Sequence, residues 1–159
     1  MNLNVKYRKP FKPYAKSYPN KETLSKNYIN FKGDIGLRLL ETTYLTSTQI
    51  EAGRVAIGRV IKRKPSIRIF INAKPNRIIT SKPAEVRMGK GKGSMDKLIF
   101  VGQPGLVLYE LSGVDYNKAM KALKSAQKKL ACKTAIFVRS RFFHEQVAAN
   151  SYPEFKDIC

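Results

Sequence analysis

The sequence is poor in the residues that most often carry metal sites and catalysis. It has two cysteines, Cys132 and Cys159, a single histidine, His144, and no tryptophan. Because the cysteines lack CxxC spacing and only one imidazole is present, we expect no metal site. The lone histidine, the lack of a GxSxG motif and the scattered acidic residues also argue against acid–base or nucleophilic catalysis. We therefore expect that the protein is not an enzyme and that it uses no cofactor.

Long apolar runs are also lacking. No stretch approaches the roughly 20 apolar residues that span a bilayer, and the first residues do not contain the apolar core of a secretory signal. We therefore expect no membrane partner and no secretion, and a reducing compartment for the two cysteines.

Acidic residues are scarce relative to basic ones. Eleven Asp and Glu stand against 31 Lys and Arg in 159 residues, which gives a net charge of +20 at pH 7. A field of this sign favours a polyanionic partner. The hydrophobic fraction of 43% is ordinary for a globular chain. Most of the chain should therefore fold and present its positive charge to an anion such as nucleic acid.

Residues 1–32 form a basic segment that contains three prolines. Eight Lys and Arg stand against one Glu, and the prolines disfavour a long helix, so we expect an extended arm. Its tyrosines and phenylalanines alternate with lysines, a mixture that neutralises phosphates and offers rings to unpaired bases. A solubilising arm and a mitochondrial transit peptide are the alternatives, the latter weakened by the predominance of lysine over arginine. The candidate RNA contacts in the arm are Lys6, Arg8, Lys9 and Lys12.

The segment that follows Leu45 has the pattern of an amphipathic helix. Thr46 and Gln49 fit a capping box, apolar residues then share one side, and Pro65 stops the helix. The candidate contacts on the opposite, cationic side are Arg59, Lys62 and Arg63. A solvated helix surface is the alternative interpretation of that side.

The rest of the chain, up to residue 139, alternates apolar runs with turns. We expect strands at 66–71, 78–80, 97–102, 106–111 and 133–139, and the turn Gln103-Pro104-Gly105 predicts a hairpin between the third and the fourth. A second helix should run from its N-cap Asp115 to about Leu130. One side of this helix is lysine-rich, and we interpret it as a solvated face: Lys118, Lys121, Lys124, Lys128 and Lys129.

The most unusual segment alternates glycine with lysine. It is not a P-loop, because Gly93 rather than Ser or Thr follows Lys92, and the strand that comes next excludes a dinucleotide fingerprint. Glycines let a backbone approach a surface closely, and lysines place point charges on phosphates. A basic loop without a fixed partner is the alternative. The candidate RNA contacts here are Arg87, Met88, Gly89, Lys90, Gly91, Lys92 and Gly93.

Several motifs, in the same order and spacing, resemble those of the large-subunit ribosomal protein L-sixteen family. The run 45–52 resembles the start of that family's basic helix, the run 82–93 resembles its KPxxxRMGKGKG loop, and the run 103–114 resembles its xPGxxLYExxGV segment. The likeness covers about residues 33–138. The arm is similar more loosely, with Phe11 in the place of a histidine.

This resemblance implies an α+β fold, a two-layer sandwich with helices packed on one side of a largely antiparallel sheet. It would have an extended basic arm (1–32), an L-sixteen-type domain (33–140) with a protruding Gly/Lys loop, and a C-terminal extension (141–159). The function implied is that of a structural component that binds large-subunit rRNA near the central protuberance and the aminoacyl-tRNA corridor, and that supports subunit assembly, tRNA positioning and translation.

The partners implied are large-subunit rRNA, aminoacyl-site tRNA and neighbouring ribosomal proteins, with no homo-oligomer. A free-standing RNA chaperone is the alternative function. The basic residues comprise 21 Lys and 10 Arg, beside 9 Asn and 8 Tyr, a bias that suggests an A+T-rich genome. We therefore expect the chain to belong to a mitochondrial ribosome; a plastid or a bacterial ribosome is the alternative.

Overall fold

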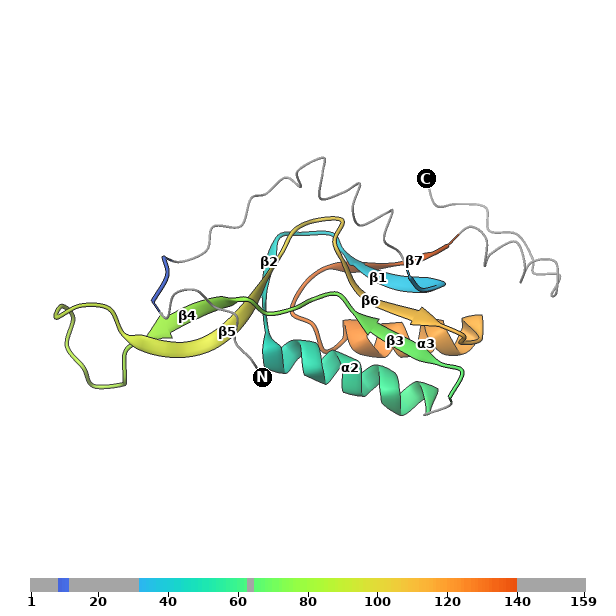
Figure 1. Cartoon of the computed structure of the whole chain (residues 1–159), viewed down its shortest axis with the longest axis horizontal. Coiled ribbons are helices and arrows are strands. Elements are labelled where there is room, and N and C mark those ends of the chain that lie inside the picture. Colours follow the sequence, from blue (N-terminus) through green and yellow to red (C-terminus); the bar gives the residue numbers. More distant parts are fainter. Residues whose placement is uncertain (1–8, 12–31, 63–64, 140–159) are drawn as a thin grey trace.

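The computed structural model describes residues 9–11, 32–62 and 65–139. Most of the predicted arm and the whole of 141–159 lie outside the described residues. Nine helices and strands follow one another in the described part (Figure 1): β1 (Ile35–Leu39), β2 (Thr43–Thr46), α2 (Ser47–Ile61), β3 (Arg68–Ile71), β4 (Arg77–Ser81), β5 (Ser94–Gly102), β6 (Val107–Ser112), α3 (Tyr116–Gln127) and β7 (Thr134–Val138).

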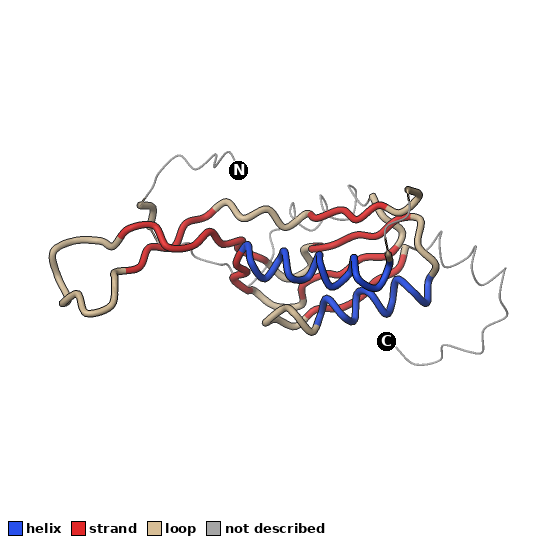
Figure 2. The backbone as a smooth tube through the Cα atoms, turned by 90° about the horizontal axis from the view of Figure 1, so that it is seen from below, coloured by secondary structure: helices blue, strands red, loops and turns tan. Residues whose placement is uncertain are grey.

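The strands form two antiparallel sheets. A four-stranded sheet has the order β3-β6-β1-β7 and a three-stranded sheet the order β2-β5-β4. The helices α2 and α3 lie side by side along one face of the larger sheet (Figures 1 and 2). This arrangement confirms the predicted α+β fold with helices on one side of antiparallel strands.

Helix α2 begins where the sequence predicts. Thr46 is its N-cap, the Thr46 hydroxyl accepts from the Gln49 backbone N–H at 3.3 Å, and the Gln49 side chain accepts from the Thr46 N–H at 2.9 Å. The capping box therefore pairs two amides that the helix itself leaves without partners. The helix turns its apolar side inward, burying Ile50, Gly53, Ala56, Ile57 and Ile61.

Helix α3 begins where the sequence predicts and ends earlier than predicted. Asp115 occupies the N-cap position, but its side chain makes no capping hydrogen bond. The helix ends at Gln127 instead of near Leu130, because the N–H groups of Lys129 and Leu130 donate to carbonyls three residues earlier, as in a 3₁₀ turn, and not four. The five lysines of the predicted solvated face are exposed, as expected.

The hairpin predicted between 97–102 and 106–111 is wrong. β5 pairs with β2 and β4 in the smaller sheet, whereas β6 pairs with β1 and β3 in the larger one. The Pro104-Gly105 turn instead crosses between the sheets, where Gly105 N–H donates to Leu39 O at 2.8 Å and Leu39 N–H donates to Leu106 O at 2.9 Å. Because both edges of β5 and of β6 are taken by other strands, the turn cannot join them as neighbours.

Candidate nucleic-acid interface

The loop 82–93 is the tip of a hairpin formed by β4 and β5. The two strands pair in antiparallel register up to Ser81 and Ser94, so the twelve residues between them form the connection. β5 is nine residues long and pairs with β2 only through Ile99–Gly102, which leaves its first part paired with β4 alone. The resulting β4–β5 ribbon extends away from the helices and carries the loop at its far end (Figure 1). We call residues 82–93 the tip loop.

Two of the three glycines in the tip loop have no packing role within the described chain. A Cβ at Gly89 or Gly91 would meet no atom within 4 Å, and both residues have positive φ, +92° and +88°. Gly93 is different, because a Cβ there would lie 2.3 Å from the Ser81 carbonyl oxygen. Gly93 therefore allows the two ends of the loop to pack closely where the strands stop pairing. Gly89 and Gly91 instead lie in the outward-facing part of the loop.

The residue between those glycines also has a left-handed backbone. Lys90 has φ 52°, which only glycine adopts without steric cost, so the sequence Gly89-Lys90-Gly91 is held in an unusual turn. Lys82 reaches across the loop and its Nζ donates to the Gly89 carbonyl. The Arg87, Met88, Lys90 and Lys92 side chains are exposed. The tip loop thus presents cations and bare backbone to the outside.

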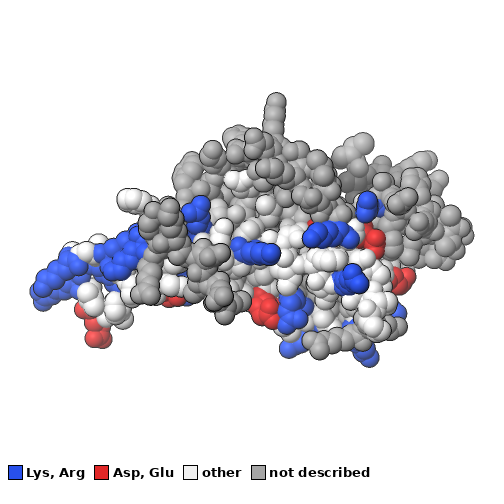
Figure 3. All heavy atoms as spheres, viewed as in Figure 1, with Lys and Arg blue, Asp and Glu red and all other residues white. Residues whose placement is uncertain are grey.

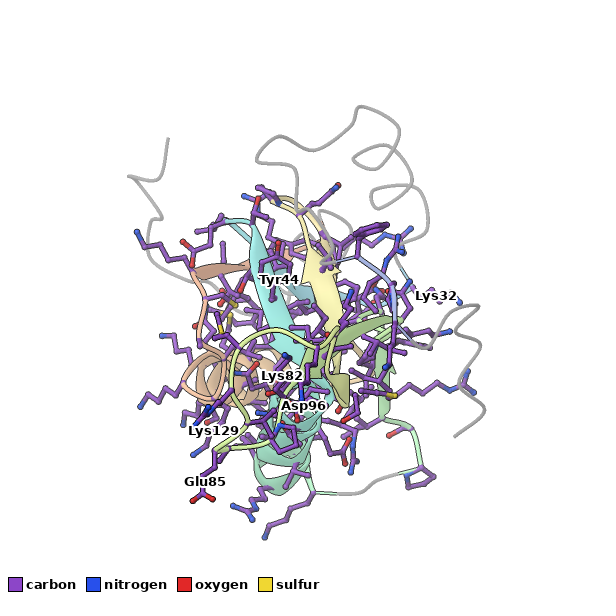
Figure 4. The ribbon with its side chains drawn as sticks, turned by 90° about the vertical axis from the view of Figure 1, so that its left-hand side faces the viewer. Lys32, Tyr44, Lys82, Glu85, Asp96 and Lys129 are labelled. Atoms are coloured by element: carbon purple, nitrogen blue, oxygen red, sulfur yellow. The ribbon has the colours of Figure 1, made fainter. Side chains whose placement is uncertain are left out.

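Positive charge continues from the tip loop along the ribbon. Arg77 and Lys97 are exposed on β4 and β5, and Lys and Arg side chains gather at this end of the molecule on the face shown in Figure 3. The nearby carboxylates belong to Glu85 and Asp96; in the end-on view of Figure 4, Glu85 points outward and away from Lys82. Arg77 and Lys97 were not among the predicted contacts, since only the strand pairing places them beside the loop. Lys82 belongs to the loop itself but was not among its predicted RNA contacts.

The structure brings one predicted arm residue to the tip loop. Lys9 donates from Nζ to the Lys92 carbonyl at 3.3 Å, and Lys92 Nζ donates to the Pro10 carbonyl. The short segment 9–11 lies beside the ribbon in both views (Figures 1 and 2). The other predicted arm residues, Lys6, Arg8 and Lys12, lie outside the described residues.

The predicted contacts on α2 lie far from the tip loop and the segment 9–11. Arg59 and Lys62 are exposed at the C-terminal end of the helix, which lies at the opposite end of the molecule from the tip loop (Figure 1). A cation in the last turn also interacts favourably with the helix dipole, which gives Arg59 a local role. Arg63 lies outside the described residues. The structure therefore separates the predicted contacts into two surfaces.

A buried carboxylate fixes the point where the arm joins the domain. Glu110, on β6, is only 1% exposed. Its Oε2 accepts from the backbone N–H groups of Lys32 and Gly33 at 2.7 and 2.9 Å, and its Oε1 accepts from Asn72 Nδ2. Sequence reasoning missed this role, although a Glu inside the apolar run of a strand is a signal for a buried, hydrogen-bonded carboxylate.

Within the described residues, no helix is long and apolar enough to cross a membrane. Nor do three or more His, Cys, Asp or Glu side chains gather there in a way that could hold a metal ion.

The fold and the cationic tip loop belong to a chain with many known relatives. The model of the family "Ribosomal protein L16p/L10e" matches residues 3–137. "Large ribosomal subunit protein uL16" of Corynebacterium urealyticum is 45% identical over 134 residues, 83% of this chain and 91% of that protein. The uL16 proteins of Fusobacterium nucleatum and Thermus thermophilus are 43% and 41% identical, over 87% and 92% of this chain and 92% and 99% of their own lengths.

The chain belongs to the ribosomal protein L16p/L10e family. It is thus a structural ribosomal protein and not an enzyme, as the sequence predicted. These three relatives are bacterial, so they lend no support to the mitochondrial location, which stays a prediction.

Proposed function

We propose that this chain binds large-subunit rRNA near the central protuberance and the aminoacyl-tRNA corridor, and that it supports subunit assembly and tRNA positioning. The observation that carries the proposal is the tip loop, in which Gly89 and Gly91 lack a side chain although no described residue fills the space that a Cβ would occupy. Backbone that is kept bare and surrounded by cations suits close approach to a folded, negatively charged partner.

The residues of the tip loop take different parts in this proposal. The planar guanidinium of Arg87 can make two parallel hydrogen bonds to one phosphate, whereas Lys90 and Lys92 act as point charges. Met88, which is 96% exposed, adds an apolar contact beside them. Gly89, Gly91 and Gly93 let the loop enter a narrow space in RNA. The ribbon carries the loop well away from the helices, and this reach favours contact with aminoacyl-site tRNA as well as with rRNA.

The other predicted contacts extend the tip-loop surface along the arm and add a second, separate surface at the end of α2. Lys6, Arg8, Lys9 and Lys12 would follow phosphates along the arm, and Arg59, Lys62 and Arg63 would contact phosphates at the end of α2. Two separate cationic surfaces suit a protein that holds two rRNA segments together in a subunit. Neighbouring ribosomal proteins are the further partners.

Sedimentation of the chain with ribosomal particles tests the proposal. We expect the tagged, full-length chain to migrate near-stoichiometrically with large subunits in moderate salt. The alternative function, a free-standing RNA chaperone, predicts that the chain stays in the light fractions. Recovery in light fractions alone would therefore overturn the proposal.

We propose a mitochondrial location on the lysine, asparagine and tyrosine bias of the sequence alone. Fractionation of the source cells tests it, since a mitochondrial protein enters the mitochondrial large subunit. Recovery in plastid or bacterial cytoplasmic ribosomes would contradict this location and leave the ribosomal function untouched.

A further inference from the structure

Within the described residues, the arm and the tip loop meet at one residue, Lys92. Its carbonyl accepts from Lys9 Nζ at 3.3 Å, its own Nζ donates to the Pro10 carbonyl, and the same Nζ lies 5.7 Å from the centroid of the Phe11 ring. This last distance is within the range of a cation–π interaction. These contacts join Lys92 to Lys9 and Pro10, which are 83 and 82 positions away in the chain.

The Phe11 ring is held there without being covered. Phe11 is 94% exposed, and only Met88 is more exposed among the large apolar side chains of the described residues. The other phenylalanines of the described part, Phe70, Phe100 and Phe137, are partly buried in the domain. An exposed ring that is positioned by a contact with a cation, and not by burial, leaves most of its surface open to a ligand.

The surroundings of the ring select the kind of ligand. The Lys92 ammonium lies over the ring, the Lys9 ammonium bonds to the Lys92 backbone, and Arg87 and Lys90 belong to the same exposed loop. An apolar protein surface that covered Phe11 would also have to desolvate these charges, which costs free energy unless they are paired. A nucleotide satisfies both needs, since its base stacks on the ring while its phosphate pairs with the ammonium groups.

We propose that Phe11 and Lys92 form a stacking site for one unpaired nucleobase, with Lys9 and Lys92 neutralising the adjacent phosphate. The proposal rests on the rRNA-binding function proposed above and adds to it the class of nucleotide that the arm and the tip loop bind together. It concerns a position where the sequence has Phe rather than the histidine of the resembling family motif.

Binding to two labelled oligomers tests the proposal. One is an oligoadenylate of about ten nucleotides, a length within the known range of single-strand sites. The other is a ribose-phosphate strand of the same length without bases. The full-length chain, Phe11→Leu and the matched control Phe11→Tyr are compared by fluorescence anisotropy at fixed salt, and circular dichroism checks that each variant folds.

We expect Phe11→Leu to weaken binding of oligoadenylate by about five-fold to about a hundred-fold, the range found for loss of one base stack. Its affinity for the abasic strand should not change, and Phe11→Tyr should bind both strands like the original chain. In a Lys92→Met background, the effect of Phe11→Leu should become smaller, because Lys92 positions the ring.

Two results overturn the stacking site. In the first, Phe11→Leu weakens binding of both strands equally or of neither, while binding still falls steeply with salt; the stacking site is then wrong and RNA binding stands. In the second, the unaltered chain binds neither strand in a salt-dependent way; both the stacking site and the proposed RNA binding then fail.

Discussion

Gly53 of helix α2 lies directly against the phenol of Tyr109 on β6. The Tyr109 hydroxyl donates to the Ile50 carbonyl at 2.8 Å, one turn earlier in the helix, and a Cβ on residue 53 would lie only 2.4 Å from that hydroxyl oxygen. Tyr109 is fully buried. A glycine that weakens the helix by up to about 1 kcal/mol relative to alanine thus makes room for a hydrogen bond between sheet and helix.

Replacing these two residues together should reveal their coupling. Gly53→Ala favours the helix but crowds the Tyr109 hydroxyl. A Tyr109→Phe background removes that oxygen and leaves the ring Cζ, 3.0 Å from the added Cβ, as the nearest atom, so the crowding is reduced. We expect Gly53→Ala to be more favourable in Tyr109→Phe than in the original chain, by about 1 kcal/mol in the free energy of unfolding. Urea unfolding of the four proteins measures this difference. Equal effects of Gly53→Ala in the two backgrounds would contradict the contact.

The same tyrosine should make stability depend on alkaline pH. Burial raises the pKa of Tyr109 above that of a free tyrosine. Above about pH 10 the unfolded chain loses this proton while the folded chain keeps it, so stability present below that pH is lost as the pH rises. We expect the free energy of unfolding to fall more between about pH 9 and pH 11 for the original chain than for Tyr109→Phe. Parallel curves for the two proteins would argue against it.

The glycines of the tip loop should separate function from stability. Gly91→Val cannot keep the left-handed backbone without strain, but nothing packs in the space around its Cβ, so the loop can change conformation locally. We therefore expect little change in melting temperature but poor incorporation into large subunits or slow tRNA accommodation. Gly93→Val is the contrasting variant, because its side chain would clash with the Ser81 carbonyl and should separate the ends of β4 and β5. This variant should therefore lower the melting temperature. Thermal melts and polysome profiles measure the two effects. Normal polysomes and growth with Gly91→Val would contradict the role of the tip.

Single lysines should contribute differently to binding of RNA. Loss of one phosphate contact in Lys90→Ala should lower the magnitude of the slope of log K against log salt by about 0.7 to 0.9. Lys121→Ala on the exposed face of α3 removes the same charge at a position that we interpret as solvated, and is the control. Titrations with large-subunit rRNA at several salt concentrations give both slopes. If the two variants show the same slope, the tip loop has no special part in binding.

Glu110 should be important for stability. In Glu110→Gln an NH₂ group replaces one acceptor oxygen, and Asn72 must turn its side-chain oxygen inward to accept from it, while the Lys32 and Gly33 amides keep a neutral acceptor in place of a carboxylate. We expect a loss of about 1–3 kcal/mol in the free energy of unfolding, because hydrogen bonds to a buried charged acceptor are stronger than those to a neutral one. The exposed Glu85→Gln serves as control for the loss of charge. A change no larger than that of the control would show that the three hydrogen bonds matter little.

Local patterns in the sequence predict the elements whose stability is local. The start of α2 depends on Thr46 and Gln49, three residues apart, and the structure confirms it. The strands predicted at 78–80 and 133–139 likewise agree with β4 and β7 to within one residue at each end. Such features need only neighbours in the chain, so composition and spacing reveal them.

Features that depend on distant partners escape prediction. The strand β1 was not among the predicted strands, although Ile35, Leu37 and Leu39 alternate with Gly36 and Arg38 as in a half-buried strand. That pattern could have revealed the strand, but its place between β6 and β7 comes from pairing alone. The Pro104-Gly105 turn looks like a hairpin locally, yet competition from β1 and β2 for the edges of β6 and β5 decides otherwise. The meeting of Lys9 with Lys92 also joins residues that no local pattern relates.

The length of β5 sets how far the tip loop reaches from the body. Thr46, where β2 ends and α2 begins, pairs with Ile99, so the same strand that carries the loop is anchored beside the first turn of the helix. A strand rises about 3.4 Å per residue and its side chains alternate between faces. Removing two residues from each strand of the ribbon would therefore draw the loop back by about 7 Å with its faces preserved. Removing a single residue from each would turn its cations to the other side.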